Sequence, residues 1–161
     1  MVRVRGFIGT VLLLLALGGC VGQGGPAGPR YVEAAAQVPA VPPDRARFFF
    51  FRDYEPYESL ARPYIRLNGD IVGFSVPGGV WYRDMPPGTY KIAADSPGLY
   101  PNQDKSVTVA AGDTIFVQVQ SYKSYNSGFD MYDPDTFVIV IIDAAQGRRA
   151  IDTMRYVTMA P

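Results

Sequence analysis

Residues 46–52, Ala-Arg-Phe-Phe-Phe-Phe-Arg, decide what kind of fold this chain adopts. Successive side chains of a β-strand point to opposite faces, so the run Phe48 to Phe51 places large aromatic rings on both sides of one strand. A strand of this kind is stable only where packed layers cover both of its faces. We therefore expect residues 46–52 to form a strand in the middle of a β-rich domain.

The next segment, residues 63–76, predicts a β-hairpin. Two apolar runs flank Asn68-Gly69, which is the strongest short-range hairpin signal because both residues tolerate positive φ. Pairing across this turn puts Leu67 opposite Asp70 and Ile65 opposite Val72. One face of the hairpin then belongs to the core, and the other is polar. The expected core face carries Ile65, Leu67, Val72, Phe74 and Val76, and the expected outer face carries Tyr64, Arg66 and Gly73.

Further short strands follow, each separated from the next by turn residues. Strands are expected at 80–84 and 89–95, on either side of the turn Pro86-Pro87-Gly88, with Tyr90, Ile92 and Ala94 facing inward. Residues 106–111 and 114–120 are expected to pair as a second hairpin around Gly112-Asp113. In that hairpin Gln118 and Gln120 face outward, while the inward positions are Ile115, Val117 and Val119.

The C-terminal part contains the most apolar run of the domain. Residues 137–142, Phe-Val-Ile-Val-Ile-Ile, predict a central strand because the run is short and β-branched. Residues 149–159 form either one more strand or a short helix followed by a strand. About eight short strands predict an all-β fold, a single antiparallel β-sandwich spanning residues 44–161.

The first 20 residues have a different character. Arg3 and Arg5 precede an apolar run, Phe7 to Leu17, that is too short to span a bilayer and leads through small residues to Cys20, the only cysteine of the chain. This pattern is typical of a secretory signal peptide, residues 1–19, with a cleavage site between Gly19 and Cys20. The alternative is that Cys20 is only a small apolar residue closing the signal.

Residues 20–43 are expected to follow as a tether. The stretch after Cys20 is rich in glycine, proline and alanine and has too few apolar residues to bury, so we expect it to be disordered. As a flexible coil, residues 21–43 would reach roughly 25–30 Å, and about 70 Å in polyproline geometry. A short helix at 31–38 is conceivable, but no convincing cap precedes it.

Composition excludes several classes of function. Removal of residues 1–19 takes two of the 15 basic residues and none of the 15 acidic ones, which leaves 13 and 15 and a net charge of −2. This balance gives no reason to expect a nucleic-acid partner, which would require a basic excess. The chain has no histidine, which removes the commonest general base and the commonest metal ligand.

Two resemblances extend this interpretation. Leu17-Gly18-Gly19-Cys20 resembles the lipobox of bacterial lipoproteins, which implies that the Cys20 thiol is diacylated and that the signal is cut before it. Residues 45–150 resemble a family of small bacterial lipoproteins that carry the domain of unknown function numbered 2846, a β-sandwich in the style of PEGA and immunoglobulin-like domains. The matching segments are residues 46–52, Leu67-Asn68-Gly69, Val72-Gly73, Trp81-Tyr82, residues 85–90 and residues 111–117. The family has no established catalytic residues, so the resemblance implies none here.

An aromatic segment is the candidate interaction surface. Tyr122, Tyr125, Phe129 and Tyr132 crowd residues 122–135, and such side chains suit a surface that stacks on sugar rings or contacts a protein. The alternative is that a sandwich with many aromatic residues must place some of them at its ends. Asp130, Asp133 and Asp135 lack the glycine and distal glutamate of a calcium loop, and we expect neither a metal nor another cofactor.

These observations favour a non-enzymatic protein of the bacterial cell envelope. We expect the lipid on Cys20 to hold it at a membrane, and Val21, where an aspartate would favour the inner membrane, to favour the periplasmic face of the outer membrane. The folded part would act as a structural module or an interaction module for an envelope protein. One alternative is a module that binds peptidoglycan or a surface glycan. Another is an unrecognised hydrolase, although no serine lies in a nucleophile-elbow or Ser-x-x-Lys context.

Overall fold

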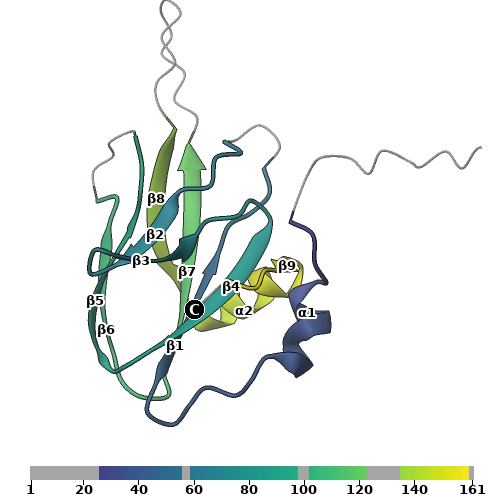
Figure 1. Cartoon of the computed structure of the whole chain (residues 1–161), viewed down its shortest axis with the longest axis vertical. Helices are drawn as coiled ribbons and strands as arrows, with labels where there is room; N and C mark the ends of the chain where they lie inside the picture. Colours follow the sequence, from purple (N-terminus) through teal and green to yellow (C-terminus); the bar gives the residue numbers. More distant parts are fainter. Residues whose placement is uncertain (1–25, 56–58, 98–101, 123–134, 160–161) are drawn as a thin grey trace, which may run out of the picture.

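The computed structural model describes residues 26–55, 59–97, 102–122 and 135–159, which form one β-rich domain (Figure 1). Two short helical segments come first and one longer helix comes near the end. The elements are α1 (Tyr31–Ala34), a 3-10 turn (Ala35–Gln37), β1 (Ala46–Phe51), β2 (Tyr64–Leu67), β3 (Asp70–Phe74), β4 (Gly79–Met85), β5 (Gly88–Ala94), β6 (Lys105–Val109), β7 (Thr114–Tyr122), β8 (Thr136–Ile142), α2 (Ala144–Asp152) and β9 (Arg155–Tyr156). No helix within these residues is long and apolar enough to cross a membrane.

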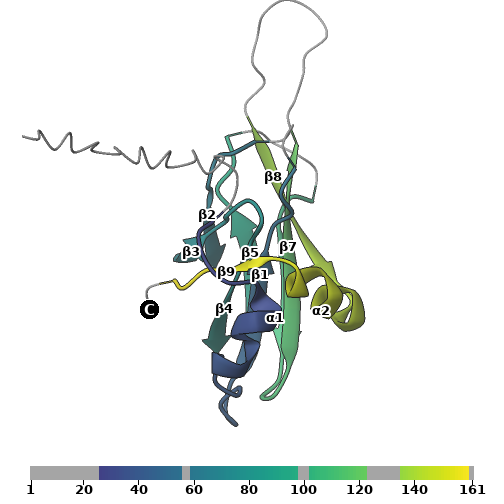
Figure 2. The same ribbon diagram turned by 90° about the vertical axis from the view of Figure 1, so that its right-hand side faces the viewer.

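The strands form two packed sheets, so the all-β sandwich is confirmed. Sheet A has the order β8-β7-β1-β4-β9, and sheet B has the order β3-β2-β5-β6. In Figure 2 the sheets lie side by side, with α1 and α2 on the outer side of sheet A. The prediction of a wholly antiparallel sandwich needs correction, because β1 pairs with β7, and β4 with β9, in parallel.

The phenylalanine run occupies the centre of sheet A, as predicted. All six residues of β1 are buried, with β4 on one side and β7 on the other. Phe48 and Phe50 point between the sheets, where Phe50 stacks on Trp81 with ring centroids 4.4 Å apart. Phe49 and Phe51 point to the opposite side and pack under the helices. The two covering layers are sheet B and the helical layer.

The hairpin at 63–76 forms with the predicted turn, but its register is displaced. Asn68 and Gly69 have φ values of 53° and 95°, and Leu67 lies opposite Asp70. A bulge between Ile65 and Arg66 then places Ile65 opposite Gly73 instead of Val72. The bulge puts Gly73 over the Trp81 indole, where an added Cβ would lie 2.6 Å from Trp81 Cη2.

The bulge also changes which side chains face the solvent. Phe74 lies opposite Tyr64 on the outer face of sheet B, so its assignment to the core face is wrong. Ile71 lies opposite Arg66 on the same outer face and is 52% exposed. Ile65, Leu67 and Val76 are buried, as predicted.

Residues 105–122 do not form the predicted second hairpin. β6 pairs with β5 in sheet B, whereas β7 pairs with β1 and β8 in sheet A. The turn at Gly112, with φ 87°, is therefore a corner at which the chain passes from one sheet to the other. Backbone bonds from Gly112 N to Arg45 O and from Arg47 N to Asp113 O, both 2.8 Å, fix this corner to the start of β1. The predicted inward positions Val117 and Val119 are nevertheless buried.

β8 is an edge strand, so the prediction of a central strand at 137–142 is wrong. The run is apolar because both of its faces are covered: Phe137 and Ile139 enter the core between the sheets, and Ile142 packs into the cluster under the helices. The open edge is also partly satisfied, since Ile139 N donates to Gln103 O at 2.9 Å and Phe137 N donates to Ser96 Oγ at 3.0 Å. This pairing protects an apolar edge from association with another chain.

The C-terminal segment follows the second of the two predicted alternatives, a helix and then a strand. The helix begins earlier than expected, after Asp143, whose side chain accepts from Ala145 N at 2.8 Å and caps α2. Gly147 of α2 lies directly against Phe116 of β7.

Residues 28–39 pack against the domain, so the packed chain begins well before the expected boundary at Asp44. Tyr156 N donates to Pro29 O at 2.9 Å and Tyr31 N donates to Met154 O at 2.7 Å. Tyr31 also packs edge-on against Phe49 at 5.4 Å, and Ala34 is buried. Arg30 N donates to Glu33 Oε2 at 3.0 Å, a capping contact that the sequence did not make evident.

Candidate binding site

An open hollow of about 230 Å³ lies on the outer side of sheet A, at the end of β7. We call it the β7 hollow. α2 covers β7 around Phe116 and leaves the strand beyond that point uncovered. Because side chains alternate along a strand, the uncovered face presents Gln118, Gln120 and Tyr122. The hollow is lined by these three residues and by Arg52, Asp53, Glu55, Val119 and Ser121.

A row of hydrogen-bonding side chains crosses the β7 hollow. Gln118 Nε2 donates to Asp53 Oδ2 at 2.7 Å, and Gln120 Nε2 lies 3.4 Å from Gln118 Oε1. Tyr122 Oη donates to Gln120 Oε1 at 2.8 Å, and the tyrosine is 47% exposed. Gln118, Gln120 and Tyr122 follow one another at intervals of roughly 7 Å along β7, and amide, carboxylate and hydroxyl groups of this kind can bind the hydroxyls of a ligand. An adjacent tyrosine ring adds an apolar face for stacking.

A buried arginine holds the wall of the β7 hollow in place. The Arg52 side chain is 2% exposed, donates to Ala61 O and to Ser121 Oγ at 2.8 Å each, and also donates to Ser59 O. Its guanidinium lies 5.1 Å from the centre of the Phe137 ring. Three charge-assisted bonds from one planar group fix the loop after β1 to β7.

Ser59 and Asp135 belong to this structural network. Ser59 Oγ donates to Asp135 Oδ2 and accepts from Ala61 N at 3.1 Å. Ser59 is 3% exposed, so its hydroxyl is closed to a substrate. The contacts therefore give the hydrolase alternative no nucleophile at this place.

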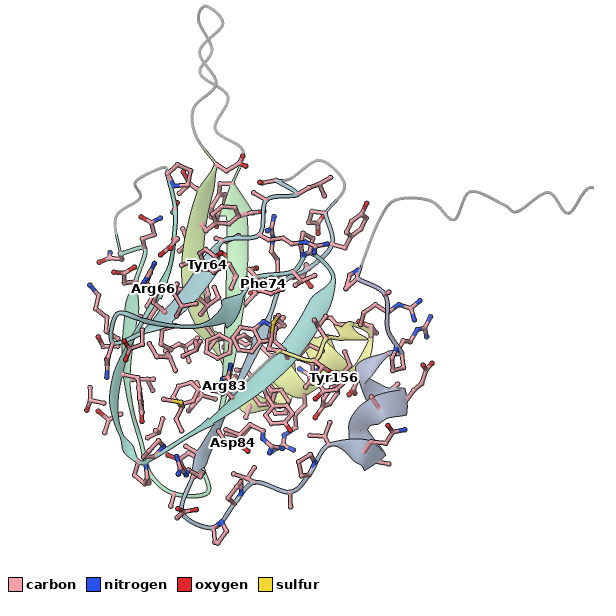
Figure 3. All side chains as sticks on the ribbon, viewed as in Figure 1. Tyr64, Arg66, Phe74, Arg83, Asp84 and Tyr156 are labelled. Carbon is pink, nitrogen blue, oxygen red and sulfur yellow. The ribbon has the colours of Figure 1, made fainter. Side chains whose placement is uncertain are left out.

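The outer face of sheet B is a second exposed surface, with aromatic and charged side chains together (Figure 3). Tyr64 and Phe74 lie opposite each other on β2 and β3, and Tyr64 is 52% exposed. Beside them Arg66 donates to both carboxylate oxygens of Asp95, at 2.6 and 2.9 Å. The hydrogen bond from Arg66 is the largest cause that lowers the pKa of Asp95, and the same bond raises the pKa of Arg66.

A second hollow, of about 300 Å³, runs along β4 where β9 no longer covers it. Its lining includes Tyr82, Arg83, Asp84 and Tyr156, of which the last three are labelled in Figure 3. Arg83 Nη2 donates to Val72 O at 2.6 Å and so links β4 to β3. Asp84 is held by Arg47 through two bonds of 2.7 Å. The polar groups of this hollow are thus engaged in holding the two sheets and the N-terminal segment together.

Of the four aromatic residues predicted to form an interaction surface, only Tyr122 lies within the described residues. Tyr122 lies at the rim of the β7 hollow, while Tyr125, Phe129 and Tyr132 lie outside the described residues, as do Gly19 and Cys20. Of the possible calcium ligands only Asp135 is described. Within the described ranges no group of three or more acidic or cysteine side chains is placed to hold a metal ion.

Most of the β7 hollow cannot be predicted from the sequence. The pattern places Gln118 and Gln120 on the outer face, as the structure does, but it does not indicate that α2 leaves that face open or that Asp53 turns back onto it. The one available signal is the alternation of apolar and polar residues at 117–120.

No family model, curated protein or solved structure matches this chain. The resemblance based on residues 45–150 therefore stays a prediction.

Proposed function

We propose that this protein is a lipid-anchored component of the bacterial cell envelope whose β-sandwich serves as a non-catalytic binding or structural module. The observation that carries the proposal is the sequence Leu17-Gly18-Gly19-Cys20 behind a short apolar run, with the only cysteine of the chain at its end. One acyl chain binds a membrane only marginally, whereas two or three anchor a protein stably. Val21 supports the outer membrane, with the domain in the periplasm.

The anchor is tested by metabolic labelling with radioactive palmitate. The parent chain should take up label, and Cys20→Ala should take up none, because the acceptor sulfur is gone. Val21→Ala is the matched control, since it alters the neighbouring residue and keeps the thiol. Equal labelling of Cys20→Ala and the parent chain would show that the anchor is not on this cysteine.

A second candidate function is the binding of peptidoglycan or a surface glycan in the β7 hollow. It is favoured by the row formed by Asp53, Gln118, Gln120 and Tyr122, which combines hydroxyl-binding groups with an exposed aromatic ring. The sequence also predicts Tyr125 and Tyr132 for this function, and both lie outside the described residues. An envelope protein is the alternative partner for this row of side chains.

This second function is tested by pull-down with purified insoluble cell wall. Tyr122→Ala removes the stacking ring, and loss of a central aromatic contact typically costs about 2 kcal/mol, or roughly 30-fold in affinity. Tyr64→Ala is the matched control, because Tyr64 is equally exposed but lies on the outer face of sheet B. Unchanged pull-down with Tyr122→Ala would exclude the β7 hollow as a glycan site, and loss with Tyr64→Ala alone would assign binding to the other sheet.

A further inference from the structure

The N-terminal chain is fixed to the domain only a few residues after Cys20. Arg155 Nη1 donates to Gly28 O at 3.0 Å, and Tyr156 N donates to Pro29 O at 2.9 Å. Gly28 approaches β9 so closely that an added Cβ would lie 2.6 Å from Tyr156 O. A segment that links Cys20 to the domain therefore reaches a fixed point at residue 28 or 29, and not at residue 43.

This short length restricts how the domain can be oriented. Nine residue steps separate Cys20 from Pro29 and span at most about 30 Å when fully extended, or roughly 15–18 Å as a flexible coil. A compact domain of the size of residues 26–161 has a radius of gyration of about 14 Å and hence a diameter of about 35 Å. The tether is thus shorter than the domain is wide, so the point where it attaches cannot be turned fully away from the membrane.

We infer that the side of the domain carrying α1, β9 and residues 26–30 lies against the lipid headgroups, and that the opposite side, formed by the edge strands β6 and β8, points away. Figure 2 looks directly onto the inferred membrane side. β4 and β9 end one edge of sheet A and β8 ends the other, which fixes the two opposite sides. This inference rests on the proposed lipid anchor at Cys20.

The charges on the inferred membrane side are compatible with this contact. Four exposed arginines and three exposed carboxylates lie on α1, α2, β9 and the residues next to them, which gives a surplus of one positive charge: Arg30, Arg148, Arg149 and Arg155 against Glu33, Asp143 and Asp152. A basic side chain at an anionic surface contributes about 1 kcal/mol. A surplus of one is too small to orient the domain, so the orientation comes from the tether.

The orientation can be measured with one fluorophore at each of two positions. Val32 on α1 is 57% exposed on the inferred membrane side, and Ser106 on β6 is exposed on the opposite side. The full-length lipidated protein with Val32→Cys or Ser106→Cys is labelled with a thiol-reactive dye and reconstituted in phosphatidylethanolamine–phosphatidylglycerol vesicles that contain spin-labelled headgroups. The introduced cysteine is the only reactive thiol, because the Cys20 sulfur is acylated. We expect several-fold stronger quenching at residue 32 than at residue 106.

A third protein tests the tether as the cause. A Gly/Ser segment of about 20 residues inserted between Gly25 and Pro26 raises the flexible reach of the tether to roughly 27–32 Å and its extended length to roughly 100 Å, and should bring the two quenching values together. Protein that does not bind the vesicles would overturn the lipid anchor itself. Bound protein with equal quenching at both positions would overturn the orientation and leave the anchor intact, and a difference that survives the insertion would overturn the tether as its cause.

Discussion

Gly147 provides a sharp test of how the helical layer fits sheet A. A Cβ at this position would lie 2.2 Å from Phe116 Cγ and 2.5 Å from Phe116 Cβ. Phe116 is 2% exposed and stacks on Phe49 with ring centroids 5.3 Å apart, so its ring has no room to move aside. We therefore predict that Gly147→Ala forces α2 away from β7.

The expected magnitude is a balance of two opposing effects. In the interior of a helix alanine is more favourable than glycine by about 1 kcal/mol. Overpacking of a close contact costs about 1–3 kcal/mol, and the upper part of this range applies because the overlap involves atoms next to the strand backbone. The net free energy of unfolding should fall by about 2 kcal/mol, which corresponds to a Tm lower by roughly 8 °C for a domain of this size.

The measurement is thermal and urea unfolding followed by circular dichroism. Gln146→Ala is the matched control, because Gln146 is the preceding residue of α2 and is exposed, so its effect should stay within about 0.5 kcal/mol. If Gly147→Ala leaves stability unchanged or raises it by the 1 kcal/mol that helix propensity predicts, the close approach of α2 to β7 is refuted.

Three further predictions follow from the charged and phenolic groups. Arg47→Ala leaves the carboxylate of Asp84 without its partner in a largely buried site, so the free energy of unfolding measured in urea should fall by roughly 3 kcal/mol. The double variant Arg47→Met, Asp84→Leu removes both charges and should recover part of that loss, and equal losses for the two variants would contradict this prediction. Burial is the largest cause that raises the pKa of Tyr31 above 10.0, so the stabilising contribution of this phenol is complete below pH 10 and decreases as pH rises through the folded pKa. Tyr31→Phe should therefore reduce the loss of stability at alkaline pH and change the free energy of unfolding at neutral pH by no more than about 0.5 kcal/mol. An unaltered pH dependence at alkaline pH would contradict this assignment. Arg66 lowers the pKa of Asp95 below 3.8, so this ion pair stabilises the fold above that pH and ceases to do so as pH falls through the folded pKa. Asp95→Asn should lower the free energy of unfolding at pH 7 by less than about 1 kcal/mol, because the pair is partly exposed. A larger loss, or a loss that persists in strong acid, would refute this assignment.

Local patterns predicted most of the strands correctly. Asn68-Gly69 requires positive φ at both residues, and the turn forms where these residues stand. Phe48 to Phe51 require two covering layers, and both are present. These features depend only on the backbone and on the alternation of side chains, which a few neighbouring residues specify.

Pairing between distant segments was predicted less well. The apolar run at 137–142 has the same sequence pattern whether its strand lies at the centre or at the edge of a sheet. The turn at Gly112 likewise has the same pattern whether the strands on either side of it pair with each other or lie in different sheets. The bulge at Ile65 brings Gly73 against the indole of Trp81, which comes 16 residues after Ile65, and nothing in the residues around position 65 indicates this contact. The hydrogen bond from Gln118 to Asp53 joins residues that lie 65 positions apart in the chain, so local patterns do not indicate it. Of the β7 hollow, only the outward orientation of Gln118 and Gln120 could therefore be predicted.

The sequence by itself determined the fold class and the expected chemistry of the N-terminus, because aromatic alternation, turn residues and a lone cysteine act within a few residues of chain. Only the tertiary structure decided where the tether ends and which faces stay open. Tyr156 N holds Pro29 by a backbone hydrogen bond, and α2 covers β7 only as far as Phe116. Both contacts join segments that lie far apart in the chain. Contacts of this kind depend on the shape of the whole packed core, which no single stretch of residues encodes.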